Sequence, residues 1–279
     1  MAKEHPAAAT LRGGNVGADG LQHADRPRRQ CVARGELSVS APDPLLLPAT
    51  VQQHLFATGA QTAQALAAAV AANLQDGVRR RRRAGLIVPG GRTPVAFLDQ
   101  LAAQQIGWSG VTVSLSDDRL VPADHADSNE GVVRRHLLQK AAASASLIPL
   151  VSAASAPQVQ LASAERALAA MPRPSDAAVL GMGEDGHTAS LFPGAPGTAE
   201  ALDLRRPERV ALVSPAGAPH PRISLTLRAL LDTRAVMILI QGEGKAAAIE
   251  RAARSDPARH PIAAFLQQKS VPVHVYYNR

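Results

Sequence analysis

The segment that covers residues 179–194 constrains the fold more than any other, because it joins a strand pattern to a glycine-rich turn. Its sequence is VLGMGEDGHTASLFPG. The apolar run 177–180 has the length of a buried strand, and Gly181 begins a turn that holds two further glycines. In α/β proteins, ligands bind at the carboxyl ends of strands, and glycines allow the backbone to approach a ligand closely. The segment therefore predicts an α/β fold with a ligand site at this turn.

Two side chains in this turn, Asp185 and His187, can hold or move a proton. Histidine suits proton transfer near neutral pH, so His187 is a candidate general base. In the alternative interpretation, His187 bonds a loop carbonyl and Asp185 is a turn or N-cap residue. The spacing of the residues alone does not decide between these two interpretations of His187. Residues 188–192 resemble the start of a helical turn.

Strand and helix patterns alternate along the chain after residue 53. Strands are predicted at 54–57, 86–88, 111–116, 177–182, 210–213, 235–240 and 271–277. Helices are predicted at 61–74, 93–104, 128–140, 158–171, 223–231 and 245–254. This alternation predicts a mostly parallel sheet with helices on both faces. The arginine run 79–83 is interpreted as a solvated loop after the first helix.

The amino-terminal part of the chain lacks this alternation. Residues 1–48 are rich in Gly, Ala, Pro and Arg, so we expect a disordered extension there and a single α/β catalytic domain over 49–279. Acidic residues in the extension offset its basic ones, which disfavours a nucleic-acid-binding arm. We find neither an apolar run of membrane-spanning length nor a signal-peptide core, and we expect a cytoplasmic protein without membrane contact.

Composition narrows the class of ligand. The chain has 30 Lys+Arg against 23 Asp+Glu, and the resulting charge of +7 favours an anionic ligand. Aromatic residues make up only 3%, which disfavours single-stranded nucleic acid. The single cysteine excludes an intramolecular disulfide and a thiolate metal cluster. No His, Cys or Asp group has the sequence spacing of metal ligands, so neither a metal nor a cofactor is predicted.

Three more segments follow predicted strands. In 89–94, Gly90, Gly91, Arg92 and Thr93 precede a helix and could cradle a phosphate; an ordinary tight turn is the alternative.

In 116–122, Asp117 and Arg119 could orient a polar substrate, and the alternative is a salt-bridged loop whose Asp118 and Arg119 are solvated. Lys245 opens a helix, where a cation is unfavourable unless an anion is bound. Together these loops predict an enzyme acting on a sugar phosphate, with Arg92, Thr93, Arg119 and Lys245 near His187.

These motifs resemble those of the glucosamine-6-phosphate isomerase/6-phosphogluconolactonase family, and above all its lactonases. The matching segments, in chain order from about residue 52 to 270, are GGRTP at 90–94, DDRLVP at 117–122, SN at 128–129, GMGEDGHTASLFP at 181–193, PRISLT at 221–226 and GxxK at 242–245. The ending VHVYYNR departs from the acidic ending typical of the family.

The resemblance implies a Rossmann-like fold similar to glucosamine-6-phosphate deaminase. It also implies hydrolysis of 6-phosphoglucono-δ-lactone in the oxidative pentose phosphate pathway, without a metal. His187 would activate water, Asp185 and Asp117 would order the site, and Arg119 would face the lactone. The residues implied to bind the substrate and its phosphate are Gly90, Gly91, Arg92, Thr93, Asn129, Arg222 and Lys245.

Two other functions remain open at this stage. An aminosugar-phosphate deaminase or isomerase would share the fold, but Phe192 stands where the deaminase pattern has a glutamate. Arg119 likewise replaces the aromatic residue that follows the deaminase's acidic pair. A non-catalytic sugar-phosphate sensor would differ only in lacking turnover. The oligomeric state is not predicted.

Overall fold

A seven-stranded parallel sheet forms the centre of the protein. The computed structural model describes residues 40–152 and 156–279. The strand order is β1-β10-β9-β6-β2-β3-β5. Their bounds are β1 Val51–Phe56, β2 Ala84–Val88, β3 Val111–Leu115, β5 Ser146–Ile148, β6 Ala177–Gly181, β9 Val236–Gln241 and β10 Val273–Asn278. The predicted parallel sheet is confirmed.

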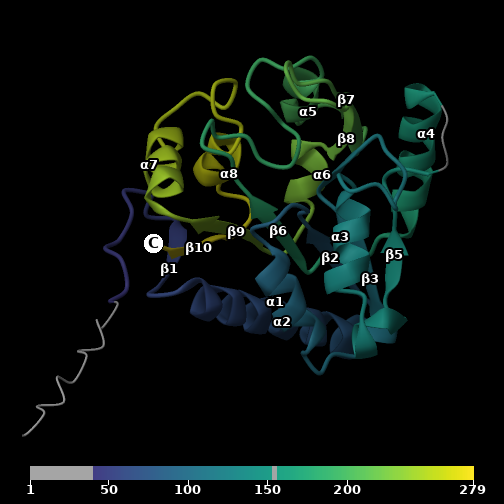
Figure 1. Cartoon of the computed structure of the whole chain (residues 1–279), viewed down its shortest axis with the longest axis horizontal. Coiled ribbons are helices and arrows are strands. Elements are labelled where there is room, and N and C mark those ends of the chain that lie inside the picture. The colour runs from purple at the N-terminus through teal and green to yellow at the C-terminus, as the bar shows by residue number, and fades with distance from the viewer. Residues whose placement is uncertain (1–39, 153–155) are drawn as a thin grey trace, which may run out of the picture. The chain divides into compact units, whose positions relative to one another are not determined.

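Helices cover both faces of this sheet, as predicted. The helices α1 and α2 run along one face, and α6, α7 and α8 lie on the other (Figure 1). The helix bounds are α1 Gly59–Arg81, α2 Val95–Ala102, α3 Asn129–His136, α4 Pro157–Ala167, α5 Thr198–Leu202, α6 Leu227–Leu231, α7 Glu243–Ala252 and α8 Ala263–Gln267. Within the described residues, none of these helices is long and apolar enough to cross a membrane.

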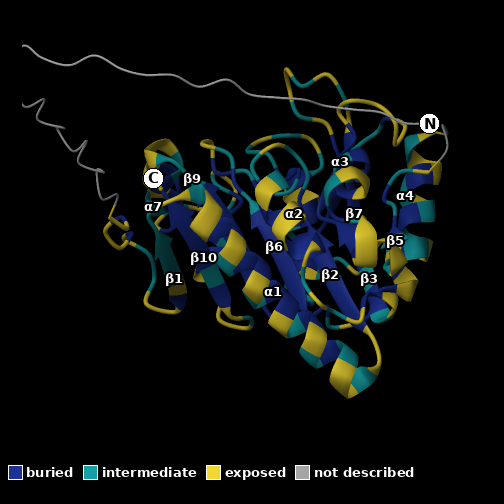
Figure 2. Ribbon diagram, turned by 60° about the horizontal axis from the view of Figure 1, so that its bottom comes forward, coloured by how far each residue is buried: buried dark blue, intermediate teal, exposed yellow. Residues whose placement is uncertain are grey.

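The core lies between the sheet and its helices. Every residue of β2 is buried, and Leu66, Val70 and Leu74 of α1 are 0% exposed. These three leucine and valine side chains recur every four residues, so they share one helix face. Figure 2 shows this face of α1 against the buried strands, with exposed residues on the opposite side. The spacing that predicted α1 therefore arises from its contact with the sheet.

A second, three-stranded antiparallel sheet was not expected from the sequence. It consists of β4 Asp117–Arg119, β8 Arg222–Leu225 and β7 Val210–Val213, in the order β4-β8-β7. Ser116 joins the two sheets, because its N–H donates to Val88 and its carbonyl accepts from Leu225, at 2.9 and 2.8 Å. Residues 117–119 were predicted to be a loop. The helix predicted at 223–231 begins only at Leu227, because the preceding residues pair with β4 and β7.

Two other local predictions were wrong. The residues Arg79–Arg81 are the last turn of α1 rather than a loop, and Arg82 ends the helix with a left-handed φ of 60°. Arg81 bonds the buried carboxylate of Asp176, which extends the helix beyond its apolar pattern. The segment 188–192 forms a tight turn instead of a helical one, closed by a bridge between Thr188 and Leu191.

Residues 1–39 of the predicted extension, which spans 1–48, lie outside the described residues. The described part after it contacts the domain. Leu45 is 8% exposed, and its backbone exchanges two hydrogen bonds with the Gln53 side chain, at 2.8 and 2.9 Å. Residues next to the predicted boundary at 48 thus pack against β1.

Candidate active site

An open cleft of about 200 Å³ lies at the carboxyl ends of β2, β3, β6 and β9. The four loops predicted to meet there do meet there. The predicted site residues that line the cleft are Gly90, Gly91, Arg92, Thr93, Asp117, Arg119, Asn129, His187 and Lys245. The other two, Asp185 and Arg222, do not line the cleft. Asp185 contacts His187, which lines it, and Arg222 contacts Phe192, which stacks on His187.

The imidazole of His187 is oriented by Asp185. Its Nδ1 lies 2.6 Å from Asp185 Oδ1, and the same oxygen accepts the His187 backbone N–H at 3.1 Å. A carboxylate at Nδ1 favours the tautomer with the proton on Nδ1, which leaves Nε2 as a lone-pair acceptor. The ring therefore bonds a carboxylate rather than a loop carbonyl. Asp185 is also the turn residue of the alternative interpretation, because its side chain accepts the backbone N–H two residues ahead.

Gly183 makes room for this ring. A Cβ at residue 183 would lie 2.3 Å from two atoms of the His187 imidazole and 2.6 Å from the Asp185 carboxylate. Its N–H also donates to the His187 carbonyl at 2.9 Å, which closes the turn. This glycine inside the turn is thus needed for the position of the histidine.

Phe192 supports the imidazole from its flat side. The two rings stack with centroids 4.0 Å apart and an angle of 24° between their planes. Arg222 approaches the same Phe192 ring, with its Cζ 5.0 Å from the centroid. Phe192 was not among the predicted site residues, and its position next to His187 depends on the tight turn that the sequence did not reveal.

Asp117 connects the His187 turn to the antiparallel sheet. Its carboxylate is buried and accepts hydrogen bonds from Ser116 Oγ at 2.8 Å and Ser190 Oγ at 2.5 Å. Ser190 lies three residues after His187 in the same turn. Ser190 is a second site residue that sequence reasoning missed, since a buried serine has no spacing of its own.

Asp118 is buried beneath the start of α3 and is not the solvated residue of the alternative interpretation. Its carboxylate accepts the backbone N–H groups of Arg119, Asn129 and Glu130 at 2.8, 2.7 and 3.0 Å. Burial raises the pKa of Asp118 to about 6, although these three donors favour the charged form. Asp118 therefore fixes the first turn of α3 to β4.

Asn129 joins three parts of the cleft. Its Oδ1 accepts from Arg119 Nη1 at 2.7 Å, and its Nδ2 donates to the Asp117 carbonyl at 2.9 Å. Gly90 packs against the same side chain, so that a Cβ at residue 90 would lie 2.0 Å from Asn129 Cγ. The first glycine of the predicted phosphate cradle is thus a requirement of packing.

Positive charge gathers around the cleft. Arg92, Arg119 and Lys245 line it. Arg222 is only 8% exposed, and burial, followed by the charge of Arg119, lowers its pKa. Cations held so close together favour an anionic ligand, because an anion relieves their repulsion.

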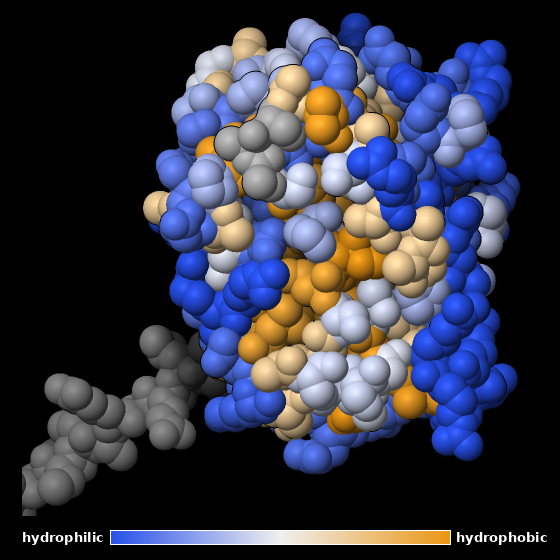
Figure 3. All heavy atoms as spheres, turned by 90° about the vertical axis from the view of Figure 1, so that its right-hand side faces the viewer, coloured by the Kyte–Doolittle hydropathy of each residue, from blue (hydrophilic) through white to orange (hydrophobic). Residues whose placement is uncertain are grey.

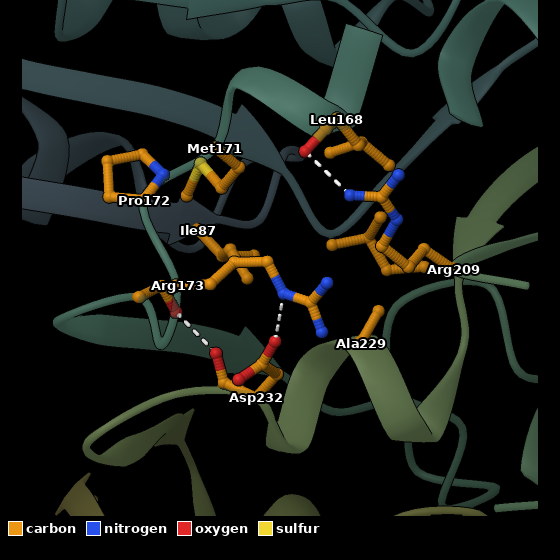
Figure 4. A pocket seen from close by; sticks show the side chains of 10 residues that line it. Ile87, Leu168, Met171, Pro172, Arg173, Arg209, Ala229 and Asp232 are labelled. Atoms are coloured by element: carbon orange, nitrogen blue, oxygen red, sulfur yellow. Dashed lines mark hydrogen bonds and ion pairs between the residues drawn. The ribbon is translucent and has the colours of Figure 1, made fainter. Parts of the chain in front are cut away.

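A second cavity does not compete with this cleft. It has a volume of about 30 Å³, far below the size of pockets that hold small molecules. Figure 4 shows Ile87, Leu168 and Met171 around it, beside an ion pair between Arg173 and Asp232. We assign no ligand to it.

Comparison with known proteins identifies the family. The family model described as "Glucosamine-6-phosphate isomerases/6-phosphogluconolactonase" matches residues 57–274. A 6-phosphogluconolactonase from Pseudomonas aeruginosa is 42% identical over 233 residues, which are 83% of this chain and 98% of the relative. One from Neisseria meningitidis is 40% identical over 226 residues, which cover 80% and 97% of the two chains.

Solved structures agree in fold. The crystal structure of a 6-phosphogluconolactonase from Shewanella baltica has a TM-score of 0.80 and 36% identity, and the match covers 85% of this chain and all of the other. A monomeric glucosamine-6-phosphate deaminase matches with a TM-score of 0.65 at 17% identity, which supports the fold alone. The chain therefore belongs to the glucosamine-6-phosphate isomerase/6-phosphogluconolactonase family.

Proposed function

We propose that this protein hydrolyses 6-phospho-D-glucono-1,5-lactone to 6-phospho-D-gluconate, as an enzyme of the oxidative pentose phosphate pathway in the cytoplasm. The observation that carries the proposal is the Asp185–His187 pair, with Nδ1 and Oδ1 2.6 Å apart, at a cleft lined by cationic side chains. The names of the relatives support the same reaction. The proposal requires no nucleic acid and no membrane.

In this mechanism His187 acts as a general base. Its Nε2 takes a proton from a water molecule, and the resulting hydroxide attacks C1 of the lactone. The C1 carbonyl becomes a tetrahedral oxyanion, for which Arg119 and backbone N–H groups of the turn after Gly183 supply donors. When this intermediate collapses, the bond between C1 and the ring oxygen breaks. The proton held by His187 then passes to the leaving oxygen. The new carboxyl group on the open chain loses its own proton to solvent, which gives the carboxylate.

Other loops bind the phosphate, away from the reacting carbonyl. Arg92, Lys245 and Arg222 supply positive charge, and the Gly90–Gly91 backbone and the Thr93 hydroxyl supply neutral donors. Binding the phosphate at a distance orients the carbonyl, and that orientation lowers the barrier to attack. This division predicts that phosphate contacts and the base can be altered separately.

The deaminase alternative is disfavoured by the surroundings of His187. A deaminase needs a further acid after the turn to open the sugar ring. Phe192 occupies that position here, and its ring stacks directly on the imidazole at 4.0 Å. An apolar ring therefore lies against His187 where ring opening needs a carboxylate.

Hydrolysis of freshly generated lactone by the purified full chain tests the proposal. Proton release is followed at fixed pH, spontaneous opening is subtracted, and glucosamine 6-phosphate is assayed in parallel for ammonia release. We expect turnover of the lactone alone. Binding of 6-phospho-D-gluconate without turnover of the lactone would point to a sensor. Release of ammonia would point to a deaminase.

A further inference from the structure

Two histidines and an aspartate meet beside the cleft, in two loops that are far apart in the sequence. His125 and Asp127 lie between β4 and α3, and His220 lies just before β8. His220 Nε2 is 3.2 Å from Asp127 Oδ2, and His125 Nδ1 is 4.0 Å from the same oxygen. All three ligand atoms lie within 4.8 Å of one another. None of the three residues lines the active-site cleft.

This set of ligand atoms suits a particular class of ion. Two imidazoles and one carboxylate are ligands of Zn²⁺ and related divalent transition metals, whereas Mg²⁺ and Ca²⁺ prefer oxygen alone. Ligands of a tetrahedral ion with bonds of about 2.0–2.1 Å stand roughly 3.3 Å apart, so only His125 has to move inward. The side chains are 43%, 52% and 26% exposed for His125, Asp127 and His220, so an ion can reach them.

The group is also attached to the cleft through the backbone. The Asp127 carbonyl accepts from Arg119 Nη1 at 2.9 Å, and the His220 carbonyl accepts from Arg222 Nη1 at 3.3 Å. Two of the residues that would bind the ion therefore also accept hydrogen bonds, through their backbone carbonyls, from the guanidinium groups of Arg119 and Arg222. An ion shared between the two loops would fix these carbonyls relative to each other.

We propose that His125, Asp127 and His220 bind one divalent transition-metal ion, with Zn²⁺ as the probe, and that the ion ties the loop after β4 to the loop before β8. None of the three ligands lines the catalytic cleft, and the ion takes no part in the chemical step proposed above. Binding through His125 Nδ1 replaces the bond in which that atom accepts the Asp127 N–H, at 3.1 Å.

The test is a titration of the full chain, without a polyhistidine tag, with ZnCl₂ against a chromogenic chelator. We expect one Zn²⁺ per chain at pH 7.5, and no binding of Mg²⁺ at the same concentration. His220→Gln and Asp127→Asn should each weaken Zn²⁺ binding by about tenfold or more, since even outer-shell partners of metal ligands have effects of that size. Zn²⁺ should also raise the melting temperature of the unaltered chain but not that of His220→Gln.

Two sets of variants serve as controls. His136→Gln removes a histidine that pairs with one acid only, Asp99 at 3.0 Å, and should leave Zn²⁺ affinity unchanged. His274→Gln removes one member of another close pair, in which His54 Nε2 and His274 Nδ1 are 3.1 Å apart. Loss of the stoichiometric ion in His274→Gln or His187→Asn, with full binding in His220→Gln, would overturn the proposal. A chain that binds no Zn²⁺ at 100-fold excess over protein would overturn it as well.

Discussion

Arg119 and Arg222 face each other directly across the antiparallel pair of β4 and β8. Like charges at directly opposed positions of a sheet destabilise it, and the neighbouring charge of Arg119 contributes to the lowered pKa of Arg222. Hydrogen bonds to nearby carbonyls hold both side chains in place. The charges of Asp117 and Asp127 offset part of this repulsion. An anionic substrate, with its oxyanion at Arg119 and its phosphate near Arg222, would relieve the rest.

Removing a cation that lines the cleft or lies beside it should weaken binding of the phosphorylated substrate. For Arg222→Gln and Lys245→Ala we expect kcat/KM with the phosphorylated lactone to fall by roughly 10–100-fold, because a charge-assisted hydrogen bond contributes about 1.5–3 kcal/mol. Hydrolysis of unphosphorylated gluconolactone should change little. Arg134→Gln is the control, since that arginine pairs with Glu130 on α3. Equal losses with both lactones would show that these residues do not bind phosphate.

Replacing the histidine should remove the general base and leave the fold intact. We expect His187→Asn to lower kcat by roughly 100-fold or more, the contribution typical of base catalysis. Asp185→Asn should cause a smaller loss, because it disturbs the tautomer and orientation of the ring but retains the ring itself. Rates are measured with the spontaneous opening subtracted. Near-normal turnover by folded His187→Asn would assign the base to another group, with Asp117 the next to test.

Gly90→Ala should destabilise the protein through Asn129. The added Cβ would lie 2.0 Å from Asn129 Cγ, and relieving such an overlap typically costs about 1–3 kcal/mol of unfolding free energy. Urea denaturation measures the loss. Gly181→Ala is the matched control, since a Cβ there meets no atom within 4 Å. Recovery of stability in the double variant Gly90→Ala/Asn129→Ala would trace the loss to this contact.

The buried carboxylate of Asp118 should make stability depend on pH. Burial raises the pKa of Asp118 to about 6. The folded protein therefore binds the proton of this carboxyl group more tightly than the unfolded chain does. The free energy of unfolding should therefore fall as the pH rises from about 4 to 6, by about 3 kcal/mol at 1.36 kcal/mol per pKa unit. Urea denaturation of the unaltered protein and of Asp118→Asn, compared across this range, isolates the effect. A difference that stays constant with pH would mean that the three backbone donors outweigh burial.

Removing residues from the amino terminus should lower stability only when the deletion extends beyond residue 39. We expect removal of residues 1–39 to leave both turnover and melting temperature unchanged, as the lack of a core pattern predicts. Removal of residues 1–48 also deletes Leu45, which is 8% exposed, and should cost about 2 kcal/mol. Thermal unfolding of the two shortened chains compares them. Equal stability would show that Leu45 adds nothing.

The parallel sheet could be predicted because its information is local. Central strands are buried on both faces and therefore read as short apolar runs, as in β2 and β9. The loops after these strands then had to meet at one edge, and His187, Arg92 and Lys245 do line one cleft.

The strand predicted at 210–213 is confirmed as β7. Its antiparallel sheet could not be predicted, because β4 and β8 depend on distant partners. The three residues of β4 carry two acids and an arginine, and only their pairing with β8 makes them a strand. The stacking of Phe192 on His187 and the role of Ser190 were missed for a related reason. Their roles follow from a turn in which Ala189 adopts a φ of 50° and Thr188 Oγ1 bonds the Gly181 carbonyl at 2.8 Å. No periodicity in the sequence signals that geometry.

The pairing of β1 with β10 has a consequence for the order in which the protein forms. Among the described strands, β1 pairs only with β10, and β10 is translated after every loop that forms the cleft. On the ribosome, β1 therefore waits without its partner, while β10 emerges after β9 and inserts between β1 and β9. Contacts between residues so distant in sequence form slowly. The cleft can thus be assembled before the sheet edge closes, and an unpaired β9 or β1 edge is the surface that a chaperone would have to protect during synthesis.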